Sequence, residues 1–373
     1  MCRMSVVLTQ KSDKEYQLIA SGQMPPKMAA QYLKEERLEI RTFSSILLEM
    51  YHNDDLLLRL IQQFQDDNPE ANPRSISKKI QNWLNDKNKP TSREDIFHIA
   101  FALRLNLAQV NTLLGACTDY GIHYRDSLDA VYSWFLLHQR SFYEARKFLQ
   151  SLPPLPQTEQ LHSNTESRNV TQELQAAFSL VRTEEDLRQC YLDNMHRMGH
   201  LHFRAFHHFQ KYLDQLIHPA CAWGGMKEPD YSIEAVMDQY LSLKMPSTRN
   251  REGFTVIQKI LKHNWPNATV LKNIRLRKED VPRKLLLLLY VVTENALDDE
   301  YDEMYEDYIA PDERLEDHWW MLNAILSDCG MPPLDPRNAT DWLILYSLSA
   351  EDEPMSQRME EVISYMFEDS QDP

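Results

Sequence analysis

Glycine is scarce in this chain, with only 8 Gly among 373 residues. Gly supplies the left-handed turns of β-rich folds and the phosphate-binding loops of nucleotide-dependent enzymes. Its scarcity therefore favours helices joined by ordinary loops. No region alternates apolar and polar residues as a half-buried strand does, and no fixed-period repeat marks a solenoid. The sequence predicts an all-α fold with a smaller N-terminal domain and a larger C-terminal domain.

Cysteine and long apolar runs are also rare. The five Cys lie at positions 2, 117, 190, 221 and 329, and no two have C-x-x-C spacing. This pattern argues against a disulfide framework or a zinc knuckle and favours reduced thiols. The first residues lack the apolar core of a signal peptide, and the longest apolar run (285–292) is too short to cross a bilayer. We expect a cytoplasmic protein without membrane association.

Motifs of catalysis are missing as well. The chain has no nucleophile elbow, kinase signature, Walker motif or carboxylate pair suited to acid–base chemistry. The sequence therefore predicts a protein that is not an enzyme and that binds no cofactor.

Apolar residues at helical spacing predict most of the helices, and capping patterns mark several starts. Ser92 with Asp95, Asn106 with Gln109, and Thr183 with Asp186 are such starts. Residues 1–40 are expected to form short helices. The polar stretch 152–169 contains three prolines and is expected to form a linker. The other predicted helices span 42–51, 56–64, 75–85, 92–103, 106–114, 130–152, 183–217, 233–243, 254–263, 281–296, 315–329, 339–348 and 356–367.

Charge is unevenly distributed along the chain. The first 120 residues hold 15 basic and 15 acidic residues, so the net charge of −16 comes from the remainder. Within the neutral part, residues 70–93 hold six basic and two acidic residues. A local basic patch of this kind can bind DNA even in an acidic protein. Residues 294–317 hold twelve acidic residues and one basic residue, and we expect a solvated loop there whose function stays open.

The stretch SISKKIQNWLNDKNKPTSRED (75–95) has the pattern of a DNA-recognition helix followed by a basic loop. Ile76, Ile80, Trp83 and Leu84 recur at helical spacing and predict its packed side. On the other side, the amide groups of Gln and Asn suit pairing with adenine, and the Lys and Ser side chains suit phosphates or guanine edges. The predicted DNA-binding residues are Ser75, Ser77, Lys78, Lys79, Gln81, Asn82, Lys87, Lys89 and Arg93.

The segment SKKIQNWLNDKNKPTSREDIFHIAFALRLNLAQVNTLL (77–114) resembles the second half of the lambda-repressor/Cro (Xre-like) helix-turn-helix domain. Ile80 and Trp83 match the anchors of its recognition helix, and Pro90-Thr91 matches the end of its basic loop. A helix ending in the ALxL pattern and a short capped helix follow. The resemblance implies a bacterial transcriptional regulator with Lys78, Gln81 and Asn82 in the major groove of duplex DNA.

The same resemblance implies a domain organisation. Residues 1–122 would form the helix-turn-helix domain, and residues 123–169 a connecting helix with a Pro-rich linker. Residues 170–373 would form a helical domain that senses a ligand or mediates assembly.

Two features depart from the family pattern and keep an alternative open. Asp86 stands where the family usually has Gly. About ten residues, with Asp66, Asp67 and Glu70 among them, stand where the family has a turn of three or four. Acids near the helix would repel DNA. A protein-interaction module that uses the helix-turn-helix as a scaffold is therefore the second hypothesis.

The His-rich segment MHRMGHLHFRAFHHFQ (195–210) supports a third hypothesis. Within the predicted helix, His196, His200 and His207 share one face, but no acidic or Cys residue completes a ligand set, so no metal is predicted. Arg197 and His202 have the spacing of the R-x4-H motif of HEPN ribonucleases, which are also all-α. A HEPN-like ribonuclease stays open on this resemblance.

Overall fold

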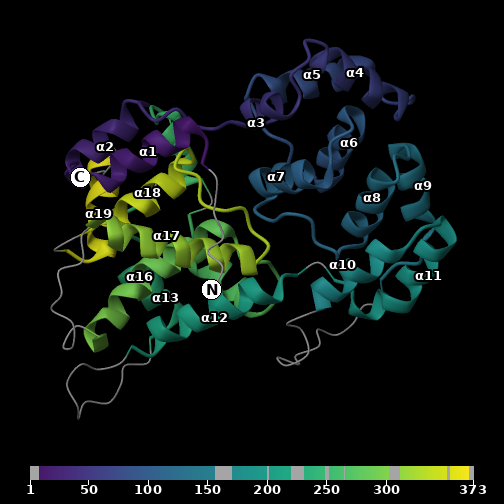
Figure 1. Ribbon diagram of the computed structural model, residues 1–373. Coiled ribbons are helices and arrows are strands. Elements are labelled where there is room, and N and C mark those ends of the chain that lie inside the picture. The colour runs from purple at the N-terminus through teal and green to yellow at the C-terminus, as the bar shows by residue number, and fades with distance from the viewer. Residues whose placement is uncertain are drawn as a thin grey trace. The chain divides into compact units, whose positions relative to one another are not determined.

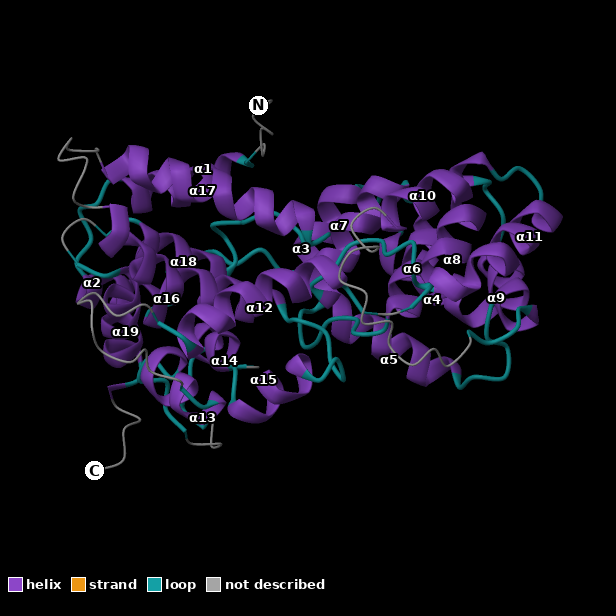
Figure 2. Cartoon of the chain, turned by 90° about the horizontal axis from the view of Figure 1, so that it is seen from below, coloured by secondary structure: helices purple, strands orange, loops and turns teal. Residues whose placement is uncertain are grey.

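The computed structural model of this chain is built from helices (Figure 1). It describes residues 8–155, 170–199, 201–219, 231–247, 252–263, 265–301, 311–350 and 353–368. Every regular element within these ranges is helical (Figure 2), which confirms the all-α prediction. None of the helices in these ranges combines the length and the apolar character that crossing a bilayer requires.

The chain divides into two compact units whose boundaries differ from the predicted domains. Unit 1 comprises residues 1–40, 204–329 and 333–373, and unit 2 comprises residues 41–203 and 330–332. The boundaries expected after residues 122 and 169 do not coincide with this division. The reason is tertiary packing, because helices near the N-terminus join the core of the C-terminal part.

The helices of unit 1 include two from the start of the chain. They are α1 (Gln10–Ala20), α2 (Pro26–Lys34), α12 (Phe203–Ile217), α13 (Ile233–Val236) with the π-helical turn η2 (Met237–Leu241), α14 (Val256–Lys262), α15 (Ala268–Arg275), α16 (Arg283–Tyr301), α17 (Pro311–Asp328), α18 (Ala339–Leu348) and α19 (Met355–Met366). Helix α2 packs on α19 (Figure 1) and buries Ala29, Ala30 and Leu33. The apolar run 285–292 in α16 is buried along its length, as predicted for a central core helix.

Unit 2 is a succession of short helices of 8 to 12 residues. They are α3 (Phe43–Met50), α4 (Leu56–Asp66), α5 (Pro73–Leu84), α6 (Arg93–Leu103), α7 (Leu107–Thr118), α8 (Ser127–Leu137), α9 (Phe142–Ser151), α10 (Val170–Leu180) and α11 (Glu184–Asn194), followed by the 3-10 turn η1 (Met195–Arg197). Helix α6 contacts α4, α7 and α8, and most of its residues are buried, so it forms the centre of this unit.

Two predicted helices are each divided in the structure. The helix expected over 130–152 is interrupted because Gln139 adopts a left-handed backbone with φ 55°. Ser141 then starts α9 with a capping box to Glu144. The helix expected over 183–217 ends at Asn194, and α12 begins at Phe203. Helices α10 and α15 had no predicted range, and residues 156–169 of the predicted linker lie outside the described residues.

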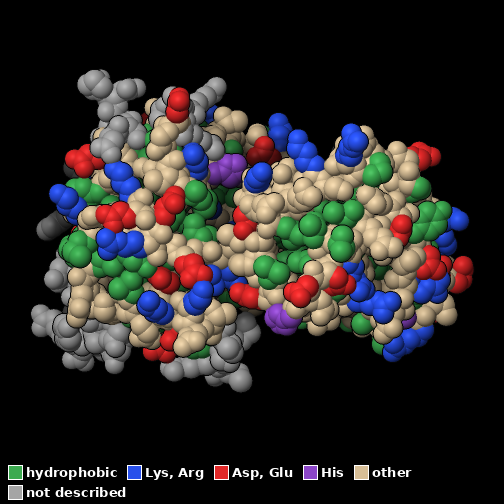
Figure 3. Space-filling model, turned by 90° about the horizontal axis from the view of Figure 1, so that it is seen from above, with side chains coloured by type: hydrophobic (Ala, Val, Ile, Leu, Met, Phe, Trp, Pro, Cys, Tyr) green, Lys and Arg blue, Asp and Glu red, His purple; other side chains and the backbone are tan. Residues whose placement is uncertain are grey.

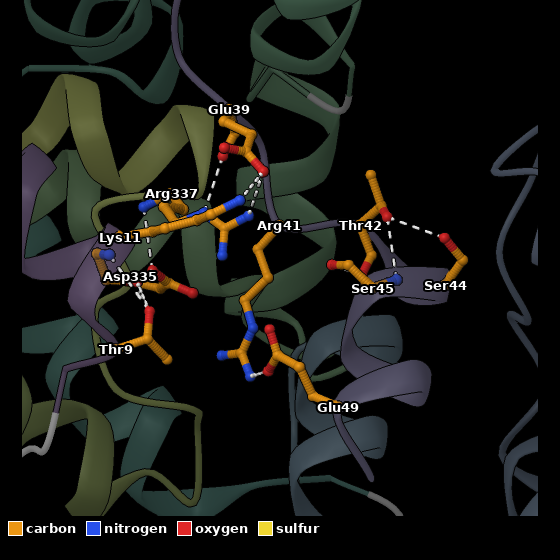
Figure 4. Close-up of polar contacts among 11 residues, drawn as sticks. Thr9, Lys11, Glu39, Arg41, Thr42, Ser44, Ser45, Glu49, Asp335 and Arg337 are labelled. Atoms are coloured by element: carbon orange, nitrogen blue, oxygen red, sulfur yellow. Dashed lines mark hydrogen bonds and ion pairs between the residues drawn. The ribbon is translucent and has the colours of Figure 1, made fainter. Parts of the chain in front are cut away.

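The chain passes from unit 1 to unit 2 after residue 40, and the residues before and after this point each make contacts within their own unit (Figure 4). In unit 1, Lys11 pairs with the Glu39 carboxylate at 2.5 Å, and the Arg337 Nε donates to the Glu39 carbonyl at 2.9 Å. In unit 2, Arg41 pairs with Glu49 of α3 at 2.5 Å. The chain is therefore anchored independently before and after the point where it leaves unit 1.

Candidate nucleic-acid interface

Helix α5 is held in unit 2 by the apolar side that the sequence predicts. Ile76, Ile80 and Trp83 are all buried, and the Trp83 ring meets Phe64 of α4 edge to face at 6.0 Å. The helix starts at Pro73 rather than Ser75, because the Asn72 side chain accepts a hydrogen bond from the Arg74 N–H. Asn followed by Pro at the first helical position is a helix-start signal, and it starts α5 two residues earlier than predicted.

The opposite side of α5 carries the polar residues of the predicted interface. Ser75, Lys78 and Gln81 are exposed, while Ser77 and Asn82 are half-buried. Figure 3, seen from above, shows Lys and Arg side chains standing out over the region of α5. Arg74 in the first turn and the C-cap Asn85 are also exposed on this helix. The predicted interface left out Arg74 because the predicted helix started at Ser75, two residues after the observed start at Pro73.

Two of the predicted phosphate-binding lysines are engaged by the protein itself. Lys79 pairs with Asp95 at 2.8 Å and lies over the Trp83 ring at 5.0 Å from its centroid. The Lys89 Nζ donates to the Ala116 carbonyl at 2.9 Å. Both side chains remain partly exposed, but binding to phosphate would require exchanging these contacts. Lys78 and Lys87 are exposed and form no ion pair within the ranges that the structure describes.

Arg93 has a structural role, which corrects its assignment to the DNA-binding residues. Its Nε donates to Asp129 Oδ1 at 2.9 Å, and its two Nη groups donate to Asp129, the Thr118 hydroxyl and the Tyr120 and Gly121 carbonyls. Asp129 is fully buried. A buried carboxylate needs a cation and hydrogen bonds to offset its lost hydration. Arg93 therefore ties the loop after α7 to α8 and is not available to phosphate.

Asp86 takes the backbone conformation that a glycine would take at this position. Its φ is 53°, in the left-handed region, where Asp is tolerated better than most residues. The Asp86 carboxylate accepts hydrogen bonds from the Ser44 N–H at 3.1 Å and from the Ser44 hydroxyl at 2.6 Å. The acid therefore binds the N-terminal end of α3, where a negative charge is favourable.

The connection between α4 and α5 comprises residues 67–72, six residues rather than about ten. It is shorter because α4 extends to Asp66 and α5 starts at Pro73. The Asp67 carboxylate is bound by His98 Nε2 at 2.8 Å and by Gln63 Nε2 at 2.8 Å. Asp66 and Glu70 are exposed, so these two acids face solvent near the connection.

His98 lies in the core of unit 2 between two aromatic rings. It stacks on Phe64 with 3.7 Å between ring centroids and on Phe142 with 3.9 Å. Burial lowers the pKa of His98, although the hydrogen bond and the charge of Asp67 act to raise it. Burial acts to raise the pKa of Asp67, but the hydrogen bonds from His98 and Gln63 leave it lowered. A neutral imidazole beside a carboxylate is therefore the favoured pair.

The structure separates the histidines that the sequence placed on one helical face. His196 lies in η1 and His207 in α12, while His200 lies outside the described residues. The expected shared face is thus corrected, because α11 ends before His196. No group of three His, Cys, Asp or Glu in the described ranges is arranged to hold a metal ion.

Arg197 and His202 also have separate partners. The Arg197 guanidinium pairs with Glu173 of α10. The His202 ring stacks between Tyr120 and His123, with centroid distances of 3.6 Å and 3.9 Å. The pair spans η1 and the segment before α12 rather than one helix, and a ribonuclease role stays a prediction.

The acidic segment 294–317 is helical at both ends, which corrects the expected loop there. Helix α16 continues to Tyr301, and α17 begins at Pro311. Residues 302–310 lie outside the described ranges.

The chain matches no family model, no curated protein and no solved structure.

Proposed function

We propose that this chain binds duplex DNA through the exposed side of α5, as a regulator of transcription. The observation that supports the proposal best is the division of α5 into two sides. Ile80 and Trp83 anchor one side in the core, while Lys78 and Gln81 stand exposed on the other. A helix held in this way can enter the major groove with short polar side chains toward the base edges.

We assign the residues of the predicted interface to two roles. Lys78, Gln81 and Asn82 suit base edges, where amide groups can pair with adenine and Lys with guanine. Ser75, Ser77 and Lys87 suit the phosphate backbone, and Arg74 adds an exposed cation in the first turn of α5. Lys79 and Lys89 would contribute only after exchanging Asp95 and the Ala116 carbonyl. Unit 1 would then serve sensing or assembly.

A mobility-shift titration with random-sequence duplex at about 50 mM salt tests this proposal. The folded wild-type chain should retard the duplex, and Lys78→Glu combined with Lys87→Glu should weaken binding at least about tenfold. Lys147→Glu is the matched control, since Lys147 is an exposed cation of unit 2 on α9 rather than α5. Failure of the wild-type chain to retard any duplex would rule the proposal out.

The same variants address the protein-interaction hypothesis. If a protein partner is captured equally well after charge reversal at Lys78 and Lys87, its contacts lie elsewhere on the chain. Loss of duplex binding in the same variant would then show that DNA binding and partner binding use different surfaces.

A further inference from the structure

We infer that α9 positions helix α5 by holding the connection between α4 and α5, with Arg146 as the positioning residue. Residues 67–72 form this connection, which is longer than the turn of a helix-turn-helix. A longer connection leaves the second helix less constrained unless other parts of the fold hold it. The structure supplies that support from outside the five helices α3 to α7.

The first contact is direct. Arg146 Nη1 on α9 donates to Asn68 Oδ1 at 2.8 Å, and Arg146 Nε pairs with Glu94 of α6 at 3.3 Å. Asn68 in turn donates from Nδ2 to the Phe64 carbonyl at 3.0 Å, and its own carbonyl accepts from the Ala71 N–H at 3.0 Å. Arg146 is therefore linked through Asn68 to both the end of α4 and the turn that leads into α5.

The second contact acts on the preceding residue. Phe142 lies four residues before Arg146, so both side chains project from the same side of α9. The Phe142 ring stacks on His98, and His98 binds the Asp67 carboxylate at 2.8 Å. One side of α9 thus supports two consecutive residues of the connection, Asp67 through His98 and Asn68 through Arg146.

The part of the chain that supports α5 is longer than the segment that resembles a helix-turn-helix domain. The resemblance ends at residue 114, but the residues that fix α5 reach Arg146 in α9. The inference about DNA rests on the proposed function, whereas the positioning of α5 within the fold does not. Hydrogen exchange therefore tests how α5 is positioned, and a separate DNA-binding experiment tests whether that positioning affects recognition of the duplex.

Hydrogen exchange of the full chain tests the positioning. Arg146→Ala and Asn68→Ala should each speed exchange of the hydrogen-bonded amides of residues 71 and 74–76 by about tenfold, as expected for the loss of one charge-assisted hydrogen bond. The effects of the two substitutions should combine to less than their product in the double variant, because both remove the hydrogen bond between Arg146 and Asn68. Lys147→Ala, a change at the exposed neighbouring residue, should leave these amides unchanged. Unchanged exchange in Arg146→Ala, or multiplying effects in the double variant, would overturn the inference.

DNA binding gives the second readout. The probe is a duplex enriched from a random pool by the wild-type chain, compared with an unrelated duplex. Arg146→Ala should reduce the preference for the enriched duplex while the salt dependence of binding to the unrelated duplex stays unchanged, since Arg146 is not a phosphate contact. An unchanged preference would contradict a role in DNA reading. If the wild-type chain enriches no duplex, the proposed function fails, and the exchange result alone decides the positioning.

Discussion

Arg93 illustrates how the role of one side chain depends on neighbours that are distant in sequence. It lies in a basic stretch, but its guanidinium binds the buried carboxylate of Asp129, 36 residues later. Removing the cation leaves Asp129 buried without its charged partner, which is among the more costly single changes. We expect Arg93→Ala to lower the free energy of unfolding by about 3 kcal/mol in a urea titration.

Lys78→Ala is the comparison for this prediction. Lys78 is exposed, so its loss should change the free energy of unfolding by less than about 0.5 kcal/mol. A similar small change for Arg93→Ala would contradict the structural role of Arg93.

His98 predicts a pH dependence of stability. Its pKa is lower in the folded chain than the ordinary value of 6.5, so the unfolded chain binds the proton more readily. The corresponding stability is present above about pH 6.5 and is lost as the pH falls below it. Asp67, whose pKa is also lowered, loses its contribution only in a more acidic range, near and below its ordinary value of 3.8.

We expect the free energy of unfolding to fall more steeply between about pH 7.5 and about pH 5.5 in the wild type than in His98→Gln. The difference in slope is at most about 1.4 kcal/mol per pH unit, the effect of one proton. Gln keeps a donor near Asp67 but does not titrate. Parallel curves for the two proteins would show that His98 does not contribute.

The sequence predicted the hydrogen-bond partners of single residues well where the two residues are close together in the chain. Asn106 and Gln109 form the expected capping box, and Thr183 caps α11 as expected. Ser92 lies at the expected N-cap but makes no side-chain cap hydrogen bond, and the Asp95 carboxylate pairs with Lys79. The partners of Arg93 and Lys89 lie 25 to 36 residues away in sequence, beyond what spacing alone can indicate.

Helix α5 shows at the scale of elements why the packed side was predictable and the start was not. The apolar spacing of Ile76, Ile80 and Trp83 determines which side is buried. The start depends on Asn72 and Pro73, which the polar composition of the preceding segment concealed. The interruption between α8 and α9 was missed for a similar reason, because Gln139 adopts a left-handed conformation without the Gly that usually marks it.

Asp86 gives a prediction for the element that follows α5. Asp86→Ala loses the hydrogen bonds to Ser44 and keeps a side chain at φ 53°, whereas Asp86→Gly loses the hydrogen bonds but relieves the backbone. We expect Asp86→Ala to be less stable than Asp86→Gly by about 1 kcal/mol in thermal unfolding. Equal stability of the two variants would argue against a left-handed conformation at this position.

Tertiary packing defines the units at the scale of the whole molecule. Leu33 of α2 is fully buried, and α2 packs on α19. Glu15 of α1 accepts from the Trp342 Nε1 of α18 at 3.2 Å. No sequence pattern joins residues about 300 positions apart, and so the predicted N-terminal domain included helices that belong to unit 1.

Leu33→Ala tests this division. Creating a cavity at a fully buried Leu costs about 2 to 5 kcal/mol. We expect hydrogen exchange to increase in α18 and α19 of unit 1, while α4 and α6 of unit 2 keep their protection. Faster exchange in α4 and α6 with no change in α19 would instead support the predicted domain of residues 1–122, in which α2 packs with the helices of unit 2.

The salt dependence of duplex binding tests the central proposal most directly. Fluorescence anisotropy between about 50 mM and about 200 mM salt gives the slope of the logarithm of affinity against the logarithm of salt concentration. A wild-type chain that neutralises phosphates through α5 has a negative slope, and Lys87→Ala should make it shallower by about 0.9. Lys147→Ala should leave the slope unchanged. Absence of duplex binding, or the same slope in the wild type and Lys87→Ala, would contradict the account.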